Sequence, residues 1–153
     1  MFYTAEKRKA KLDEIRNNPR EEVENKSLPF EYNGNPRYEA KVYKIPLEYL
    51  IFNQFNARIA DELKTYQAIG VGDDREYNEA LEQKIKDILW EQGGKNQITL
   101  TDLKKRGQNV PGVVTADGVI VSGNRRAMLL SRLKEEGESN TYFIAAILDE
   151  AYD

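Results

Sequence analysis

The sequence predicts an α+β domain in which helices pack on one small mixed β-sheet. The length of 153 residues suits one domain and is cramped for two. With 40% hydrophobic and 32% charged residues, the chain is too apolar for a disordered protein. Helix-like and strand-like segments also alternate, in the order helix, strand, helix, short helix, hairpin, helix, strand.

The chain begins with a polar helix and an extension. Residues 5–17 are rich in Lys, Glu and Arg and contain only two large apolar residues, Leu12 and Ile15. This pattern predicts an exposed helix with a thin apolar stripe, and Pro19 ends it. Residues 20–36 are polar and interrupted by proline and glycine, so we expect an arm or a linker.

A strand is predicted over residues 38–45, where polar and apolar residues alternate. One of its faces would carry Tyr38, Ala40 and Val42. The expected organisation is therefore an N-terminal helix and arm over residues 1–36, followed by the main domain over residues 37–153.

Two helices are predicted in the middle of the chain. The clearer one covers residues 73–92, because apolar residues recur there at a spacing of three and four. These residues are Tyr77, Leu81, Ile85, Ile88 and Leu89. A shorter helix is predicted over residues 99–106, with Thr99 or Thr101 as its N-cap. A glycine follows each helix and is expected to stop it.

The last third contains a hairpin, a helix and a final strand. Strands are predicted over residues 110–115 and 119–122, and the Asp-Gly pair at 117–118 between them is a strong hairpin signal. A helix is predicted over residues 124–134 and an apolar strand over residues 142–148. Together with the earlier strand, these elements would form the sheet.

The composition excludes several kinds of chemistry and shows no targeting signal. The chain has neither Cys nor His, so it cannot use a thiolate nucleophile, a Ser-His-Asp triad or a His-based metal site. The first 18 residues lack the apolar core of a signal peptide, and the apolar run at 143–148 is too short to cross a bilayer. We therefore expect a cytoplasmic protein that has no membrane association.

The charge is unevenly distributed along the chain. The overall net charge is −3, yet residues 94–134 hold eight basic and two acidic residues, a net charge of +6. Residues 59–93 carry a net charge of −5. A basic stretch inside an acidic chain indicates a local anion site. The alternative is that solvated helix faces cluster by chance, which is the simpler explanation for the lysines.

The junction between the second hairpin strand and the following helix is the best candidate for a binding site. Gly123 has no Cβ, so the chain can turn sharply there and a ligand can approach closely. The N–H groups of the next residues belong to the positive end of a helix. Arg125 and Arg126 add two cations at that end, an arrangement that favours a bound anion, and phosphate fits the planar guanidinium groups best. The alternative is an ordinary turn with solvated arginines.

Two further polar clusters are open to both structural and functional explanations. Asn53, Asn56 and Arg58 could bind a ribose, a base or a phosphate, although asparagine also stabilises loops without any ligand. Gln108 and Asn109 lie between the short helix and the hairpin, where a structural role is sufficient.

In this order, the segments resemble the N-terminal domain of ParB, a member of the ParB/sulfiredoxin superfamily. The resemblance covers residues 38–148 and depends most on Gly123-Asn124-Arg125-Arg126, where the ParB box reads Gly-Glu-Arg-Arg. It implies a ParB/sulfiredoxin-like fold and a nucleotide site that includes both arginines. The implied nucleotide-binding residues are Gly123, Asn124, Arg125, Arg126, Asn56, Arg58 and, on the base side, Gln108.

The resemblance further implies a bound nucleoside triphosphate, CTP or ATP, accompanied by Mg²⁺, and a DNA-associated partition, phage or defence protein that could hydrolyse it. Three departures matter. Asn124 replaces the ParB glutamate, which puts hydrolysis in doubt, and the absence of Cys excludes sulfiredoxin activity. The DNA-reading helix-turn-helix is also missing, so we expect either a minimal relative or a piece of a longer protein with an additional C-terminal domain. A homodimer is a further expectation.

Two alternative functions remain at this point. In the first, the same arginines grip the DNA backbone in a binding or nuclease module without nucleotide turnover, which would show as a steep salt dependence. In the second, the chain is a non-enzymatic interaction domain, and its N-terminal helix docks a partner. The narrow apolar stripe of that helix gives the second alternative little support.

Overall fold

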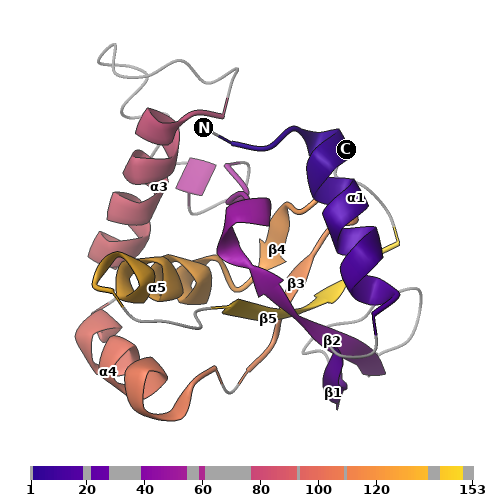
Figure 1. The fold of residues 1–153 in the computed structure, drawn as a ribbon. Helices are drawn as coiled ribbons and strands as arrows, with labels where there is room; N and C mark the ends of the chain where they lie inside the picture. The colour runs from indigo at the N-terminus through magenta and orange to yellow at the C-terminus, as the bar shows by residue number, and fades with distance from the viewer. Residues whose placement is uncertain are drawn as a thin grey trace.

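The structure is a computed structural model, and it confirms the α+β class (Figure 1). It describes residues 2–18, 22–27, 39–54, 59–60, 77–92, 94–108, 110–137 and 142–149. In the described part of the chain, the helices with defined bounds are α1 (Ala5–Arg16), the 3₁₀ turn η1 (Leu47–Tyr49), α3 (Glu79–Gln92), α4 (Asn96–Arg106) and α5 (Asn124–Glu135). The strands are β1 (Glu22–Ser27), β2 (Glu39–Pro46), β3 (Gly112–Val114), β4 (Ile120–Ser122) and β5 (Tyr142–Ile147).

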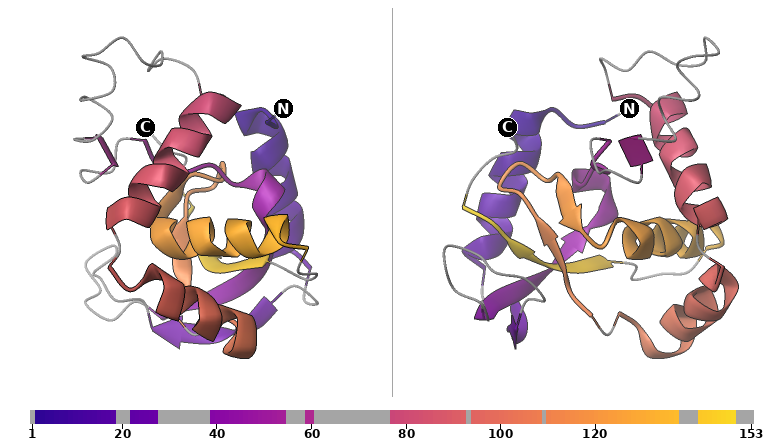
Figure 2. Two further views of the ribbon diagram at one scale, coloured as in Figure 1. Left: turned by 90° about the vertical axis from the view of Figure 1, so that its left-hand side faces the viewer. Right: turned by 180° about the vertical axis from the view of Figure 1, so that it is seen from behind.

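The strands form one mixed sheet in the order β1-β2-β5-β3-β4. The pairs β1–β2, β2–β5 and β3–β4 are antiparallel, whereas β3 and β5 run parallel. In Figures 1 and 2, α1 lies next to one end of the sheet, and α3, α4 and α5 lie together next to its other end. The final strand therefore lies in the middle of the sheet and pairs with strands from both halves of the chain.

The predicted hairpin between β3 and β4 is confirmed, and it also holds the segment that follows η1. Gly118 has a φ of 85°, the left-handed conformation that an Asp-Gly turn requires. Ile51 pairs with the end of this hairpin, because its N–H donates to Gly118 O at 2.9 Å and its carbonyl accepts from Ile120 N–H at 3.0 Å. Residues 51–54 are thereby brought beside the hairpin.

One hydrophobic cluster joins the helices to one face of the sheet. Its fully buried side chains include Leu12 of α1, Ile85 of α3, Met128 of α5 and Phe143 of β5. A smaller cluster of Val42, Val113 and Ala146 lies on the opposite face, as expected from the alternation of side chains along a strand. Leu81, Ile85, Ile88 and Leu89, four residues of the apolar stripe predicted for the helix at 73–92, are buried in α3, which confirms the helical periodicity.

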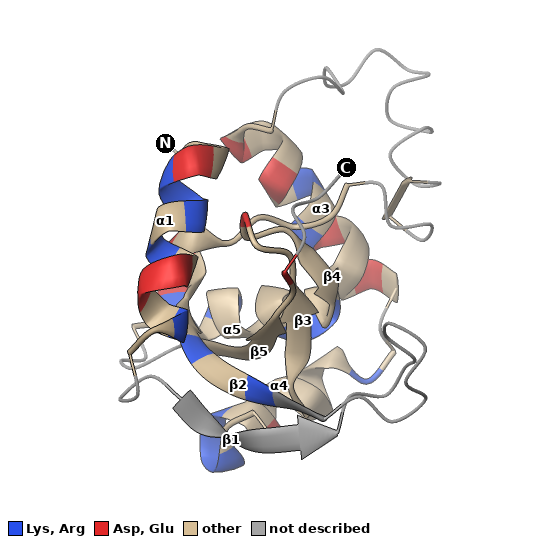
Figure 3. Ribbon diagram, turned by 90° about the vertical axis from the view of Figure 1, so that its right-hand side faces the viewer, with Lys and Arg blue, Asp and Glu red and all other residues tan. Residues whose placement is uncertain are grey.

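Helix α1 is fixed to the domain by a buried cation as well as by apolar contacts. The Nε of Arg8 donates to Asp117 O at 2.8 Å and its Nη1 donates to Tyr3 O at 2.6 Å. Burial lowers the pKa of Arg8, while the nearby Asp117 carboxylate acts in the opposite direction. At the other end of the helix, Arg16 pairs with Asp149 at 2.8 Å. The face of α1 visible in Figure 3 carries both signs of charge.

Two predictions about the elements were wrong. Residues 22–27 were expected in an arm but form β1, since their backbone pairs with β2. This segment has a single large apolar residue, so side-chain alternation gave no signal there. Helix α4 begins at Asn96 rather than at Thr99, and it has no side-chain cap. The hydroxyl of Thr101 instead donates to Gln97 O inside the helix, at 2.9 Å.

The remaining boundaries differ by a few residues. The described part of α3 begins at Glu79, and the predicted start near residue 73 lies outside the described residues. In β2, Val42 faces one cluster, while Tyr43 and Ile45 face the other. Tyr38, which was expected on the same face as Val42, lies outside the described residues. In the described part of the chain, every helix is too short or too polar to span a bilayer.

Candidate functional site

The turn from β4 into α5 requires glycine for its own geometry. Gly123 is the N-cap of α5 with a φ of 97°, and its carbonyl accepts from Ala127 N–H at 2.9 Å. A Cβ at this position would lie 2.8 Å from Cζ of Phe143 and 3.3 Å from Cα of Gly112. Backbone conformation and close packing therefore both explain the glycine. The helix has no side-chain cap, so no side chain at the N-cap satisfies the N–H groups of its first turn.

Asn124 is buried and holds the segment after η1 against the start of α5. Its Nδ2 donates to Ile120 O and its Oδ1 accepts from Asn53 N–H, both at 3.2 Å. The hydrogen bond to Asn53 places the beginning of the second polar cluster beside residues 123–126. Asn56 and Arg58, the other members of that cluster, lie outside the described residues.

The two arginines at the start of α5 differ in their surroundings. Arg125 is exposed, and its Nε donates to Oδ1 of Asn96 at 2.5 Å. Arg126 is half-buried, and no described residue forms a hydrogen bond or an ion pair with its side chain. Burial lowers the pKa of Arg126, and the positive charge of Arg125 lowers it further. Neither cation is paired with a described carboxylate, so this end of α5 carries positive charge that the described residues do not neutralise.

Gln108 lies just before β3, where its side chain continues the backbone pairing of β5. Its Oε1 accepts from Ile144 N–H at 2.8 Å, and its Nε2 donates to Ile144 O at 2.8 Å and to Val110 O at 2.9 Å. Gln108 thus completes the hydrogen bonds of β5 just before β3 begins. Its amide group, which was expected on the base side of a nucleotide, is engaged by the sheet.

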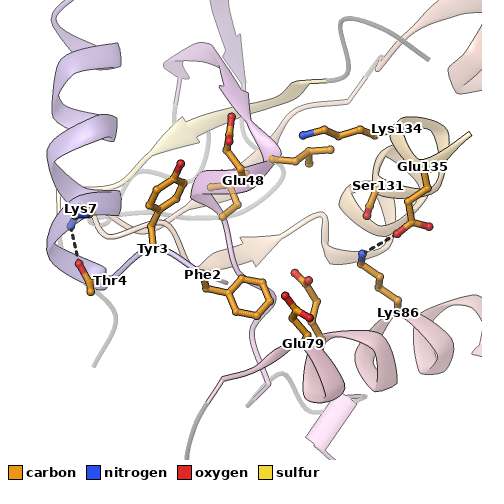
Figure 4. A pocket seen from close by; sticks show the side chains of 13 residues that line it. Phe2, Tyr3, Thr4, Lys7, Glu48, Glu79, Lys86, Ser131, Lys134 and Glu135 are labelled. Atoms are coloured by element: carbon orange, nitrogen blue, oxygen red, sulfur yellow. Dashed lines mark hydrogen bonds and ion pairs between the residues drawn. The ribbon is translucent and has the colours of Figure 1, made fainter. Parts of the chain in front are cut away.

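A cavity of about 860 Å³ lies toward the C-terminal end of α5 (Figure 4). It is bounded by the N-terminal segment, η1, α3 and α5. Its charged lining residues are Glu48, Glu79, Glu82, Glu135, Lys7, Lys86 and Lys134. The ammonium of Lys86 pairs with Glu135 at 3.3 Å. Because the charges of the lining nearly balance, the cavity selects neither an anion nor a cation by charge alone.

Because of the burial of Glu82 in this cavity, we expect the stability of the protein to depend on pH. It is half-buried and accepts a hydrogen bond of 3.2 Å from the Tyr77 hydroxyl. Burial raises its pKa. A raised folded-state pKa stabilises the protein below the unfolded value of about 4.3, and this contribution is lost as the pH rises through the folded value.

We therefore expect Glu82→Gln, which cannot ionise, to gain stability relative to the wild type as the pH rises from about 4 to about 7. Urea unfolding at a series of pH values measures this difference. Glu91→Gln, an exposed change on the same helix, should show no comparable trend. A Glu82→Gln difference that stays constant with pH would contradict the prediction.

The described residues contain no group of three or more carboxylates that could hold a metal ion. Comparisons of the chain with protein-family models, with curated proteins and with solved structures found no match.

Proposed function

We propose that the start of α5 binds the phosphate groups of a nucleoside triphosphate, as the resemblance to ParB implies. The observation that carries this proposal is a pair of guanidinium groups in the first turn of the helix that no described carboxylate neutralises. Arg126 is half-buried beside Arg125, with no anion among its described neighbours. The two guanidinium groups repel each other, and each is also unfavourable beside the positive end of the helix. A bound phosphate would offset both of these repulsions.

The chemistry of the turn suits phosphate in two ways. The first-turn N–H groups without a side-chain cap supply donors, and the guanidinium groups match pairs of phosphate oxygens. The Nε of Arg125 is occupied by Asn96, but its two Nη groups make no hydrogen bond to a described residue. Mg²⁺ would then be carried by the phosphates of the nucleotide, with CTP and ATP as the first candidates.

The proposal concerns nucleotide binding and does not include rapid nucleotide hydrolysis. A glutamate at position 124 could accept a proton from an attacking water, whereas an amide cannot. The Asn124 amide also forms hydrogen bonds with Ile120 and Asn53. We therefore expect at most slow hydrolysis, which a phosphate-release assay would measure.

Calorimetric titration with ATP, CTP, GTP and UTP, each with and without Mg²⁺, tests the proposal. We expect saturable binding of at least one triphosphate and a loss of about tenfold or more in affinity in Arg126→Ala, since hydrogen bonds to charged groups contribute about 1.5–3 kcal/mol. Arg106→Ala is the matched control, because Arg106 is exposed at the far end of α4 and pairs only with Asp102 among the described residues.

The absence of binding heat with every nucleotide at millimolar concentration would refute the proposal. Equal losses in Arg126→Ala and Arg106→Ala would also contradict it. If duplex DNA binds instead, with an affinity that falls steeply as salt is added and that depends on Arg126, the DNA-backbone alternative is correct.

A further inference from the structure

Asn96 connects the end of α3 to the start of α5. It is the first residue of α4 and is only 3% exposed. Its Nδ2 donates to Trp90 O at 2.5 Å and to Leu89 O at 3.2 Å, which satisfies carbonyl groups in the last turn of α3. Its Oδ1 accepts from Nε of Arg125 at 2.5 Å. A single buried amide therefore joins three helices.

The corner that holds Asn96 is fixed on both sides. The guanidinium of Arg132 in α5 lies over the ring of Trp90, at 3.9 Å from its centroid. This contact ties the end of α3 to the body of α5, while Asn96 ties the same turn to Arg125. The acceptor for Arg125 is consequently held by packing and hydrogen bonds rather than by a mobile surface side chain.

The bond from Arg125 Nε constrains the guanidinium group in a particular way. It restrains the plane of the group and leaves its two Nη groups without a hydrogen bond to any described residue. An arginine side chain has high rotamer entropy, and ordering such a side chain on binding costs affinity. A neutral amide acceptor restrains the side chain without cancelling its charge, which a carboxylate at the same place would do.

We propose that Asn96 is a positioning residue that preorganises Arg125 for phosphate, so that the corner between α3 and α4 controls the affinity of the site. This inference rests on the proposed function, because it concerns the same phosphate groups. Asn96 touches no ligand in this scheme and acts through Arg125 alone.

A double-mutant cycle in triphosphate affinity tests the inference, using the wild type, Asn96→Ala, Arg125→Ala and the double variant. We expect Asn96→Ala to weaken binding about fivefold in the wild-type background, which is the loss expected from one unrestrained side chain. In the Arg125→Ala background, the same change should have almost no effect on affinity.

A purely structural role would give a different result. Asn96→Ala also removes hydrogen bonds to α3, so it will lower the melting temperature, and titrations are made well below that temperature. Thr4→Ala is the matched control, because Thr4 caps α1 through a bond of 3.2 Å to Lys7 N–H, away from this corner. It should lower stability without changing affinity.

Equal affinity losses for Asn96→Ala in both backgrounds, or no loss in either, would overturn the inference. If Asn96→Ala is unfolded at the titration temperature, the cycle is repeated with Asn96→Ser, a smaller perturbation that still removes the amide acceptor. If the wild type binds no triphosphate at all, the proposed function fails instead, so the two failures are distinguishable.

Discussion

Replacement of Phe143 by alanine is expected to lower the free energy of unfolding by about 3–5 kcal/mol, the usual loss for a large aromatic side chain in a core. Phe143 is fully buried in β5, the strand that pairs with both β2 and β3. Its ring occupies the space that a Cβ would need at Gly112 or at Gly123. Removal of the ring would therefore leave a cavity directly under the turn that begins α5.

Urea unfolding measures this loss, with the neighbouring Tyr142→Ala as the control, because Tyr142 is 37% exposed. The control should cost clearly less than Phe143→Ala. Phe143→Leu should fall between the two, since it keeps part of the buried volume. Equal costs for Phe143→Ala and Tyr142→Ala would show that the ring does not support the turn.

Replacement of Leu12 by alanine is expected to lower the free energy of unfolding by about 2–5 kcal/mol. This loss is large for a residue in a helix that the sequence pattern predicts to be mostly exposed. Leu12 is fully buried, and with Ile15 it belongs to the same cluster as Phe143. If α1 is part of the cooperative unit, the unfolding transition of Leu12→Ala should remain single and shift as a whole.

The control on the same helix is Lys9→Ala. Lys9 is exposed, and its pair with Asp13 is a long surface contact of 3.8 Å, which contributes little. The free energy of unfolding of this variant should differ from that of the wild type by no more than about 0.5 kcal/mol. A Leu12→Ala variant as stable as Lys9→Ala would mean that α1 is a detachable arm.

Much of the fold could be predicted from local pattern. The periodic apolar stripe of α3, the Asp-Gly turn and the helix after Gly123 are confirmed, because each depends on residues within a few positions of one another. Strand β1 could not be predicted in this way. Its stability comes from backbone pairing with β2, and pairing leaves no mark in the side-chain pattern of a polar edge strand.

The candidate site likewise has features that could be predicted from local sequence and features that could not. Residues 123–126 could be selected from the sequence, because a glycine turn followed by a helix with two arginines is a local signal. The roles of Asn124 and Gln108 could not, since both serve distant backbone groups, at Asn53 and Ile144. Asn96 was missed altogether, because 29 positions separate it from Arg125.

From the order of its residues, this chain can be assigned its α+β class, the exclusion of Cys and His chemistry, and the place where positive charge meets a helix start. Its three-dimensional packing adds which of those polar groups are already engaged and which have no partner among the described residues. The reason is physical: charge and periodicity are properties of short segments, whereas the partner of a buried amide or guanidinium is set by contacts between segments far apart in the chain.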